Sequence, residues 1–356
     1  MHRWPTVGRS GARIGAVVLA CAAVVAGIIG VNSLLNGEHS GQAGRLSADR
    51  GQAASGPDDG WRWESYQTIE VKVPEDWGYG VTGSPPCLVK KVQRPYVGRP
   101  GGVRAIGCRD PLPVLADRAS YLWFDSKGRN PAKSAWAAEH HIVDGRTPGV
   151  QPADHGWVEE TRLVDGLHVT VLSDDDSLRR RILDSARLID GSDANGCTPD
   201  HPLAHQPHGR PASTGGLESL GSVESVAVCR YGHASDRRAP LIASSAVTGD
   251  AAGALVDAIT SAPGGSGPND KECIDTYGSD ILVLKVQGSN HDQEVLIRYS
   301  GCNFNGTDDG VKLRQLTANL LQPILTGIHR PSTYTHTLYE LVVGPAPPKF
   351  PVTPTR

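Results

Sequence analysis

The sequence predicts an α+β fold with antiparallel sheets, because pairs of strands joined by short turns are followed by single helices. Residues 157–164 and 167–172 form two strand-like runs on either side of Asp165-Gly166, a dipeptide typical of two-residue hairpin turns. Residues 281–286 and 295–299 predict a second hairpin. The chain lacks the regular alternation of strand and helix that favours a parallel sheet.

The first half of the chain adds further elements to its hairpin. Residues 68–73 alternate apolar and polar side chains, which predicts a half-buried strand that ends at Pro74. Residues 121–124 predict a short strand. An acidic run at residues 173–176 suits a helix N-terminus. The helix itself is predicted by four apolar residues at helical spacing, namely Leu178, Ile182, Ala186 and Ile189.

The second half begins with a predicted strand over residues 223–230. Thr248 is a candidate cap for a helix that runs to Ala262. Residues 311–325 predict the last helix. Its inward-facing residues would be Leu313, Leu316, Leu320 and Ile324.

Residues 14–35 predict a single transmembrane helix, because the run is apolar, carries no charge and is long enough to cross a bilayer. Arg3, Arg9 and Arg13 precede the run, whereas Glu38 is the first charge after it. This asymmetry predicts a cytoplasmic N-terminus and an extracytoplasmic body, and therefore a single-pass protein of the cell membrane.

Two other interpretations of this run stay open. One is a cleaved signal peptide, although no A-x-A-like site follows a short apolar core. The other is a lipoprotein signal, in which Cys21 of Val18-Leu19-Ala20-Cys21 is lipidated after cleavage. We favour the retained helix because the run stays apolar well beyond Cys21. All three interpretations place the bulk of the chain outside the cytoplasm.

Six of the seven cysteines follow this run, which predicts disulfide bonds in an oxidising compartment. They are Cys87, Cys108, Cys197, Cys229, Cys273 and Cys302. Their spacing favours three neighbouring pairs, 87–108, 197–229 and 273–302. Each bridge would stabilise the fold by about 3 kcal/mol. No C-x-x-C pair is present, so the cysteines do not predict a zinc site.

These features divide the chain into six segments. We predict a cytoplasmic N-terminus (1–13), a transmembrane helix (14–35), a flexible stalk (36–60), a first α+β domain (61–191), a second disulfide-rich α+β domain (192–329) and a proline-rich tail (330–356). The formal net charge of −3 gives no basic excess, so nucleic acid is not an expected partner.

The motifs of the common exported hydrolases are absent. The chain has no G-x-S-x-G, S-x-x-K, H-E-x-x-H or P-loop sequence. We therefore predict neither catalytic residues nor a cofactor. His201, His205 and His208 lie close together, but the prolines among them oppose a shared helical face, so no metal site is predicted either.

Four residues are candidates for binding. Trp61 and Trp63 open the first domain, and exposed aromatic side chains can bind sugars or peptides, although a tryptophan-filled core is the interpretation we favour. Asp308 and Asp309 precede Gly310 and could offer oxygens to a calcium ion. Their place ahead of a predicted helix favours capping instead.

Several stretches of the chain carry a resemblance to known proteins. They are Glu64-Ser65-Tyr66, 73–80, 98–101, 106–108, 228–231, 299–302 and Asp308-Asp309-Gly310. In these stretches the chain resembles a group of uncharacterised membrane-anchored proteins of Streptomyces-like actinobacteria. That group has no known biochemical function to carry over to this chain. A strand entering V-P-x-x-W at Val73 and a helix ending in Ser185-Ala186-Arg187 make the first domain similar to Mog1/PsbP-like export domains. That resemblance implies an α/β/α sandwich that binds partners rather than catalyses.

Together these observations predict a membrane-anchored extracytoplasmic protein that acts as a non-catalytic binding or interaction module at the cell envelope. The expected partners are the membrane, through the N-terminal helix, and an envelope protein or glycan. An exported hydrolase with a non-standard active site is the alternative.

Overall fold

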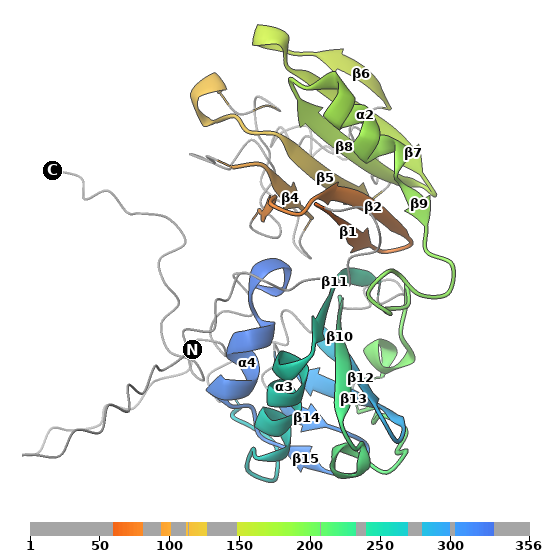
Figure 1. The fold of residues 1–356 in the computed structure, drawn as a ribbon, viewed down its shortest axis with the longest axis vertical. Helices are drawn as coiled ribbons and strands as arrows, with labels where there is room; N and C mark the ends of the chain where they lie inside the picture. Colours follow the sequence, from red (N-terminus) through yellow and green to blue (C-terminus); the bar gives the residue numbers. More distant parts are fainter. Residues whose placement is uncertain are drawn as a thin grey trace, which may run out of the picture. The chain divides into compact units, whose positions relative to one another are not determined.

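The computed structural model describes residues 60–80, 94–100, 112, 114–126, 148–206, 208–232, 240–269, 280–299 and 303–330. In these residues the chain is a mixed α+β protein with three sheets and three α-helices, as predicted (Figure 1). The predicted cytoplasmic N-terminus and transmembrane segment lie outside the described residues, as do the stalk except Gly60 and the tail except Arg330. Among the residues that are described, no helix is long and apolar enough to cross a membrane.

The first sheet is a hairpin with one added strand. β1 (Trp61–Tyr66) and β2 (Ile69–Pro74) pair antiparallel, and β9 (Arg187–Leu188) joins the free edge of β2. The strand predicted at residues 68–73 is therefore confirmed as β2, whereas β1 was not predicted.

The helix of the first half, α2 (Asp176–Asp184), begins where the acidic run predicts. The Asp175 carboxylate accepts the Leu178 N–H and caps the helix. The helix ends earlier than its apolar spacing predicts, so Ile189 lies outside it. The reason is competition from the sheet, since the Ile189 N–H donates to the Thr68 carbonyl beside β2.

The second sheet has six strands in the order β3-β4-β5-β8-β7-β6. Their bounds are β3 (Gly78–Tyr79), β4 (Tyr96–Gly98), β5 (Tyr121–Ser126), β6 (Gly149–Pro152), β7 (Val158–Val164) and β8 (Leu167–Ser173). The predicted hairpin is β7–β8, and its turn residues Asp165 and Gly166 both have positive φ, 47° and 77°. The prediction of antiparallel sheets is wrong for β3–β4 and β4–β5, which are parallel. Long connections before β4 and β5 allow the chain to return to the same end of the sheet.

The core of the first half lies between β2 and α2 on one side and the β5–β8 strands on the other. Val71, Leu122, Val169 and Ile182 are fully buried members of this cluster, and Trp61 packs at its margin. The opposite side of β5 contributes Tyr121 and Trp123 to a second, smaller cluster. Burial of both sides of β5 explains why its sequence is almost continuously apolar.

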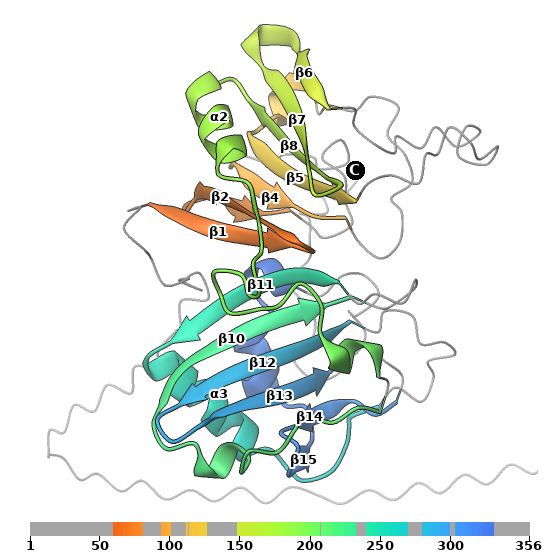
Figure 2. The ribbon, with the colours of Figure 1, turned by 90° about the vertical axis from the view of Figure 1, so that its right-hand side faces the viewer.

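The third sheet forms the second half of the chain, in the order β11-β10-β12-β13-β14-β15 (Figure 2). Its strands are β10 (Val223–Tyr231), β11 (Leu241–Thr248), β12 (Ile281–Gly288), β13 (Asp292–Arg298), β14 (Gly306–Asp308) and β15 (Leu313–Arg314). Neighbouring strands are antiparallel throughout. The strand at residues 223–230 and the β12–β13 hairpin were predicted, and both are confirmed.

Two helices cover one face of this sheet (Figure 1). They are α3 (Asp250–Thr260) and α4 (Ala318–Ile324), and their apolar sides share a core cluster with β10, β12 and β13. Short 3-10 helices complete the structure, namely η2 (Leu115–Asp117), η4 (Asp154–Gly156), η5 (Pro202–His205), η6 (Leu217–Ser219) and η7 (Gly327–His329).

Both predicted helix starts in this half are wrong. Thr248 ends β11, and α3 begins after Gly249, whose φ of 60° suits glycine. The last helix begins at Ala318, capped by the Thr317 hydroxyl, rather than at residue 311. Leu313 belongs to β15 and is 38% exposed. Leu313 is spaced from the later leucines as in a helix, but its backbone pairs with β14 and so forms a strand.

The Cys197–Cys229 disulfide predicted from spacing is present, with 5.5 Å between the Cα atoms. Cys229 projects from the face of β10 opposite α3, where it is buried with Tyr231 and Leu241. The bridge thus fastens the irregular segment around Cys197 over that face. Cys87, Cys108, Cys273 and Cys302 lie outside the described residues.

Candidate binding surface

The outward face of the first sheet carries the two tryptophans singled out from the sequence. Trp61 and Trp63 alternate along β1, so both lie on the side of the strand opposite Tyr66, and Trp61, at the start of the strand, also packs against the margin of the core. Lys72 on β2 lies directly opposite Trp63 in the strand register. Arg187 on β9 lies on the same face of the sheet, because it is paired with Glu70, two residues before Lys72 on β2.

Trp63 contacts two cations. The Lys72 ammonium is 4.9 Å from the centre of its ring, and the Arg187 guanidinium is 4.0 Å away. Arg187 also forms an ion pair with the buried Glu70 carboxylate at 2.6 Å. A cation over an indole ring is attracted by the negative face of the π-system. The ring of Trp63 is therefore occupied by this chain's own charges and is not left bare for a sugar.

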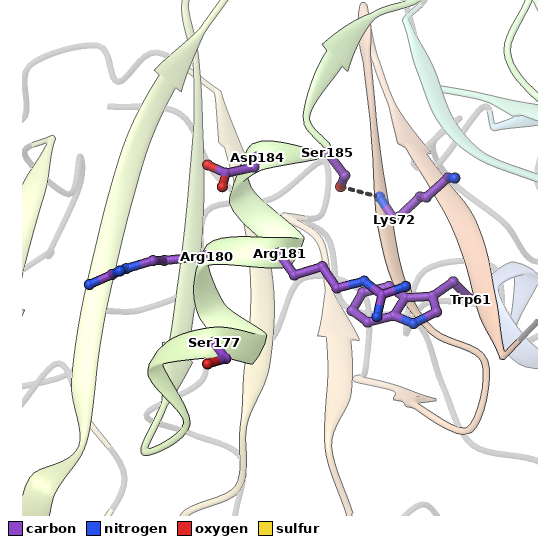
Figure 3. Close-up of a pocket in the computed structure, with 7 residues that line it drawn as sticks. All are labelled: Trp61, Lys72, Ser177, Arg180, Arg181, Asp184 and Ser185. Atoms are coloured by element: carbon purple, nitrogen blue, oxygen red, sulfur yellow. Dashed lines mark hydrogen bonds between the residues drawn. The ribbon is translucent and has the colours of Figure 1, made fainter. Parts of the chain in front are cut away.

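Trp61 makes the same kind of contact with α2. The Arg181 guanidinium lies 4.0 Å from the centre of the Trp61 ring. Figure 3 shows Arg181 extended along the indole, with Lys72 above them in the view. A pocket of about 550 Å³ opens here, lined by Trp61, Lys72, Ser177, Arg180, Arg181, Asp184 and Ser185. We call Trp61, Trp63, Lys72, Arg181 and Arg187 the tryptophan face.

Lys72 and Arg181 give the Trp61 side of the pocket a positive charge, whereas the other two charged residues that line it, Arg180 and the one carboxylate, are held in ion pairs with other side chains. That carboxylate, Asp184, is held by Arg162 at 2.6 Å. Arg180 is paired with Asp176 and points away from Trp61 (Figure 3). In the described residues Arg181 has no carboxylate partner, and its guanidinium contacts the Trp61 ring instead.

The pocket is fixed by backbone contacts as well as by charge. The Ser185 hydroxyl accepts the Lys72 backbone N–H at 2.8 Å and donates to the Ile182 carbonyl at 2.6 Å. These bonds fasten the end of α2 to β2 (Figure 3). Arg181 is therefore presented to Trp61 by a rigid frame of helix and sheet.

The inward side of β1 carries a buried ion-pair network that the sequence analysis missed. Glu64 is paired with Arg62 and with Arg99, both at 2.7 Å. Burial alone would raise the pKa of Glu64, but the two guanidinium groups outweigh it and hold that pKa below its usual value. The network is closed and internal, so we regard it as structural.

Asp308 and Asp309 are both engaged within the protein. Asp308 forms a two-bond pair with Arg210, at 2.8 Å for each bond. Asp309 is buried and accepts the N–H groups of Leu217, Val311 and Lys312. It also pairs with Arg314 at 2.9 Å. Burial raises the pKa of Asp309, yet the donated hydrogen bonds bring it below its usual value.

Asp309 therefore caps a turn between two strands and not a helix, which corrects the capping expected from the sequence. Its remaining acceptor capacity is small, and a cation would have to displace Arg314. In the described residues no three His, Cys, Asp or Glu side chains are grouped as a metal site would require.

The three clustered histidines point to different partners. His201 Nε2 is 3.2 Å from Glu294, His205 Nε2 is 2.8 Å from Asp200, and the His208 ring packs against Phe304. The structure thus does not bring these imidazoles together.

Sequence reasoning named the tryptophans but missed the three cations that cover them. Lys72 could have been found, because it alternates with the inward residues of its strand. Arg181 and Arg187 required the packing of α2 and β9 against the hairpin, which no local pattern encodes.

In its described residues the chain is therefore a mixed α+β protein that carries the tryptophan face and a disulfide between Cys197 and Cys229. Comparisons with family models, curated proteins and solved structures find no match.

Proposed function

We propose that this chain is a non-catalytic binding module held at the cell envelope, and that the tryptophan face binds an anionic envelope component. Residues 14–35 anchor it as a single-pass helix, with the N-terminus in the cytoplasm and two α+β domains, 61–191 and 192–329, outside. The Cys197–Cys229 bridge supports an oxidising location.

The observation that carries the proposal is the position of Arg181 over Trp61. Basic side chains held against aromatic rings have already lost part of their rotamer freedom. Binding an anionic ligand would therefore cost little additional side-chain entropy. Because the rings are covered, a charged ligand fits this face better than the neutral sugar suggested by bare tryptophans.

An exported hydrolase is the second candidate, and His201 with Glu294 is the histidine–carboxylate pair that it would use. His201 Nδ1 accepts the Leu203 N–H at 3.3 Å, while Nε2 faces Glu294. An imidazole that donates from Nε2 and accepts at Nδ1 has no free lone pair with which to take a proton. This arrangement favours the binding module.

The test uses the full chain in detergent, offered the anionic lipids and glycans of an envelope extract and a panel of ester, amide and glycoside substrates. We expect salt-sensitive binding and no turnover, with binding reduced in Arg181→Gln and unchanged in His201→Gln. Turnover that disappears in His201→Gln, without any binding, would establish the hydrolase instead.

A further inference from the structure

We propose that the tryptophan face docks the body onto the phosphate headgroups of anionic membrane lipids, as a second membrane contact beyond the N-terminal helix. The proposal rests on the membrane-anchored location proposed above. It names the lipid surface itself as the anionic envelope component.

The side chains of this face are those that suit a lipid headgroup layer. Tryptophan is enriched at the membrane–water interface because its ring is apolar and its N–H is polar. Basic side chains beside it are attracted to anionic lipids. Arg181 and Arg187 are exposed, whereas Trp61 and Trp63 are half-buried beneath cations. Charge would therefore meet the surface first, and the indoles would follow only to headgroup depth.

The place of this face in the chain also favours the lipid. Trp61 is the first residue of β1, and it directly follows the predicted stalk of residues 36–60. A Gly- and Ser-rich segment of this length has a root-mean-square span of about 25–30 Å. The tryptophan face would therefore stay close to the bilayer that holds the anchor.

Tethering removes the need for high affinity. A binding site on a short flexible linker experiences an effective concentration of its target in the millimolar range. At physiological salt Lys72 and Arg181, which line one pocket, can then hold the tethered body on the surface, and at low salt, where screening is weakest, they also keep the released body on anionic vesicles.

The experiment cuts the tether after the protein has folded and inserted. A site for a sequence-specific protease is placed within residues 46–55 of the full chain. The chain is reconstituted into vesicles of phosphatidylcholine, or of equal parts phosphatidylcholine and phosphatidylglycerol. After cleavage, flotation measures how much of the body stays with the vesicles, at low and at high salt.

We expect the cleaved body to stay on the phosphatidylglycerol vesicles at low salt and to leave them at high salt. It should leave the phosphatidylcholine vesicles in both conditions. Each basic residue removed should lower the partition coefficient about five-fold, so Lys72→Gln/Arg181→Gln should lower it about 25-fold. Arg181→Lys keeps the charge and should retain binding.

Arg180→Gln is the matched control, because Arg180 lies next to Arg181 on α2 but is paired with Asp176 and points the other way. Equal losses in the Arg180 and Arg181 variants would overturn the proposal, as would equal retention on both vesicle types. Thermal unfolding of each variant is measured to check that the fold is intact.

Two further outcomes distinguish a failure of the docking proposal from a failure of the membrane-anchor proposal on which it rests. If the uncut chain does not float with vesicles, the membrane anchor is wrong. If the uncut chain floats but the cut body leaves the anionic vesicles at once, only the docking face is wrong. A body that moves fully from the vesicles to soluble poly(glycerol phosphate) would identify a polymer ligand and overturn the lipid assignment.

Discussion

The Arg181 guanidinium lies 4.0 Å from the centre of the Trp61 ring, and this contact joins α2 to the first strand of the fold. Arg181 is exposed and belongs to the last turn of α2, where a positive charge also suits the helix dipole. Trp61 reaches the margin of the core formed by β2, β5, β8 and α2. The pair therefore links a surface charge to the packing of the first sheet.

The first prediction concerns the energy of this pair. In a double-mutant cycle with Trp61→Leu and Arg181→Met, we expect a coupling of about 0.5–1 kcal/mol in the free energy of unfolding, because the site is partly exposed. Urea unfolding of the four proteins measures it. A parallel cycle with Arg180→Met should give no coupling, and equal couplings in the two cycles would refute a specific cation–ring contact.

The second prediction contrasts two neighbouring aspartates. Asp309→Asn should destabilise the protein by about 3–5 kcal/mol, because it leaves the buried Arg314 charge with only the exposed Glu218, 3.7 Å away, as a counter-charge. Asp308→Asn should cost about 1 kcal/mol, since its partner Arg210 is 52% exposed. Chemical denaturation at neutral pH measures both, and equal losses would contradict the structural role assigned to Asp309.

The pH dependence of the Asp309 variant follows from the lowered pKa of that group. The folded-state pKa lies below the unfolded value near 3.8, so the contribution of Asp309 is fully present above that pH. It is lost as the pH falls through the folded-state pKa. The stability gap between wild type and Asp309→Asn should therefore shrink in acid, and a gap that widened would oppose this assignment.

The fold was predictable from the sequence where one local signal acts alone. The Asp165-Gly166 turn fixed the β7–β8 hairpin, and Asp175 capped α2 as its position in the acidic run indicates. Prediction failed where two signals compete. Residues 313–324 have helical spacing, yet Leu313 pairs with Asp308 in a strand and the helix begins only at Ala318.

Of the candidate surface, the tryptophans were predictable from the sequence and the cations beside them were not. Trp61 and Trp63 are conspicuous as residue types, and their alternation places them on one face. The cations arrive from β2, α2 and β9, and the last of these, Arg187, is more than a hundred residues away along the chain. Only tertiary packing brings such groups together, so spacing could not reveal that the rings are covered.

The third prediction concerns the disulfide. Cys197 and Cys229 are separated by 32 residues, and a loop of that length gives an expected stabilisation of about 3–4 kcal/mol. Cys197→Ser/Cys229→Ser should lower the free energy of unfolding by that amount, and reductant should lower the wild type to the same level. A reductant effect that persists in this double variant would point to other bridges, while no effect in wild type would exclude a structural role.

The last prediction concerns His329 in η7. Its Nε2 lies 2.9 Å from the Ser245 hydroxyl, and burial, reinforced by the Arg230 cation, lowers its pKa from 6.5 to about 3. The unfolded chain therefore takes up a proton that the folded chain refuses, so stability is complete above about pH 6.5 and falls as the pH drops towards 3. The slope is at most about 1.4 kcal/mol per pH unit.

His329→Gln keeps a hydrogen-bonding side chain that does not titrate, so its stability should change less between pH 6.5 and 4 than that of the wild type. His155→Gln provides the control, because the His155 side chain is 64% exposed and is not part of the packed interior. Urea midpoints across this range measure the difference. Parallel profiles for wild type and His329→Gln would mean that His329 takes up its proton without unfolding, and that its burial does not contribute to acid sensitivity.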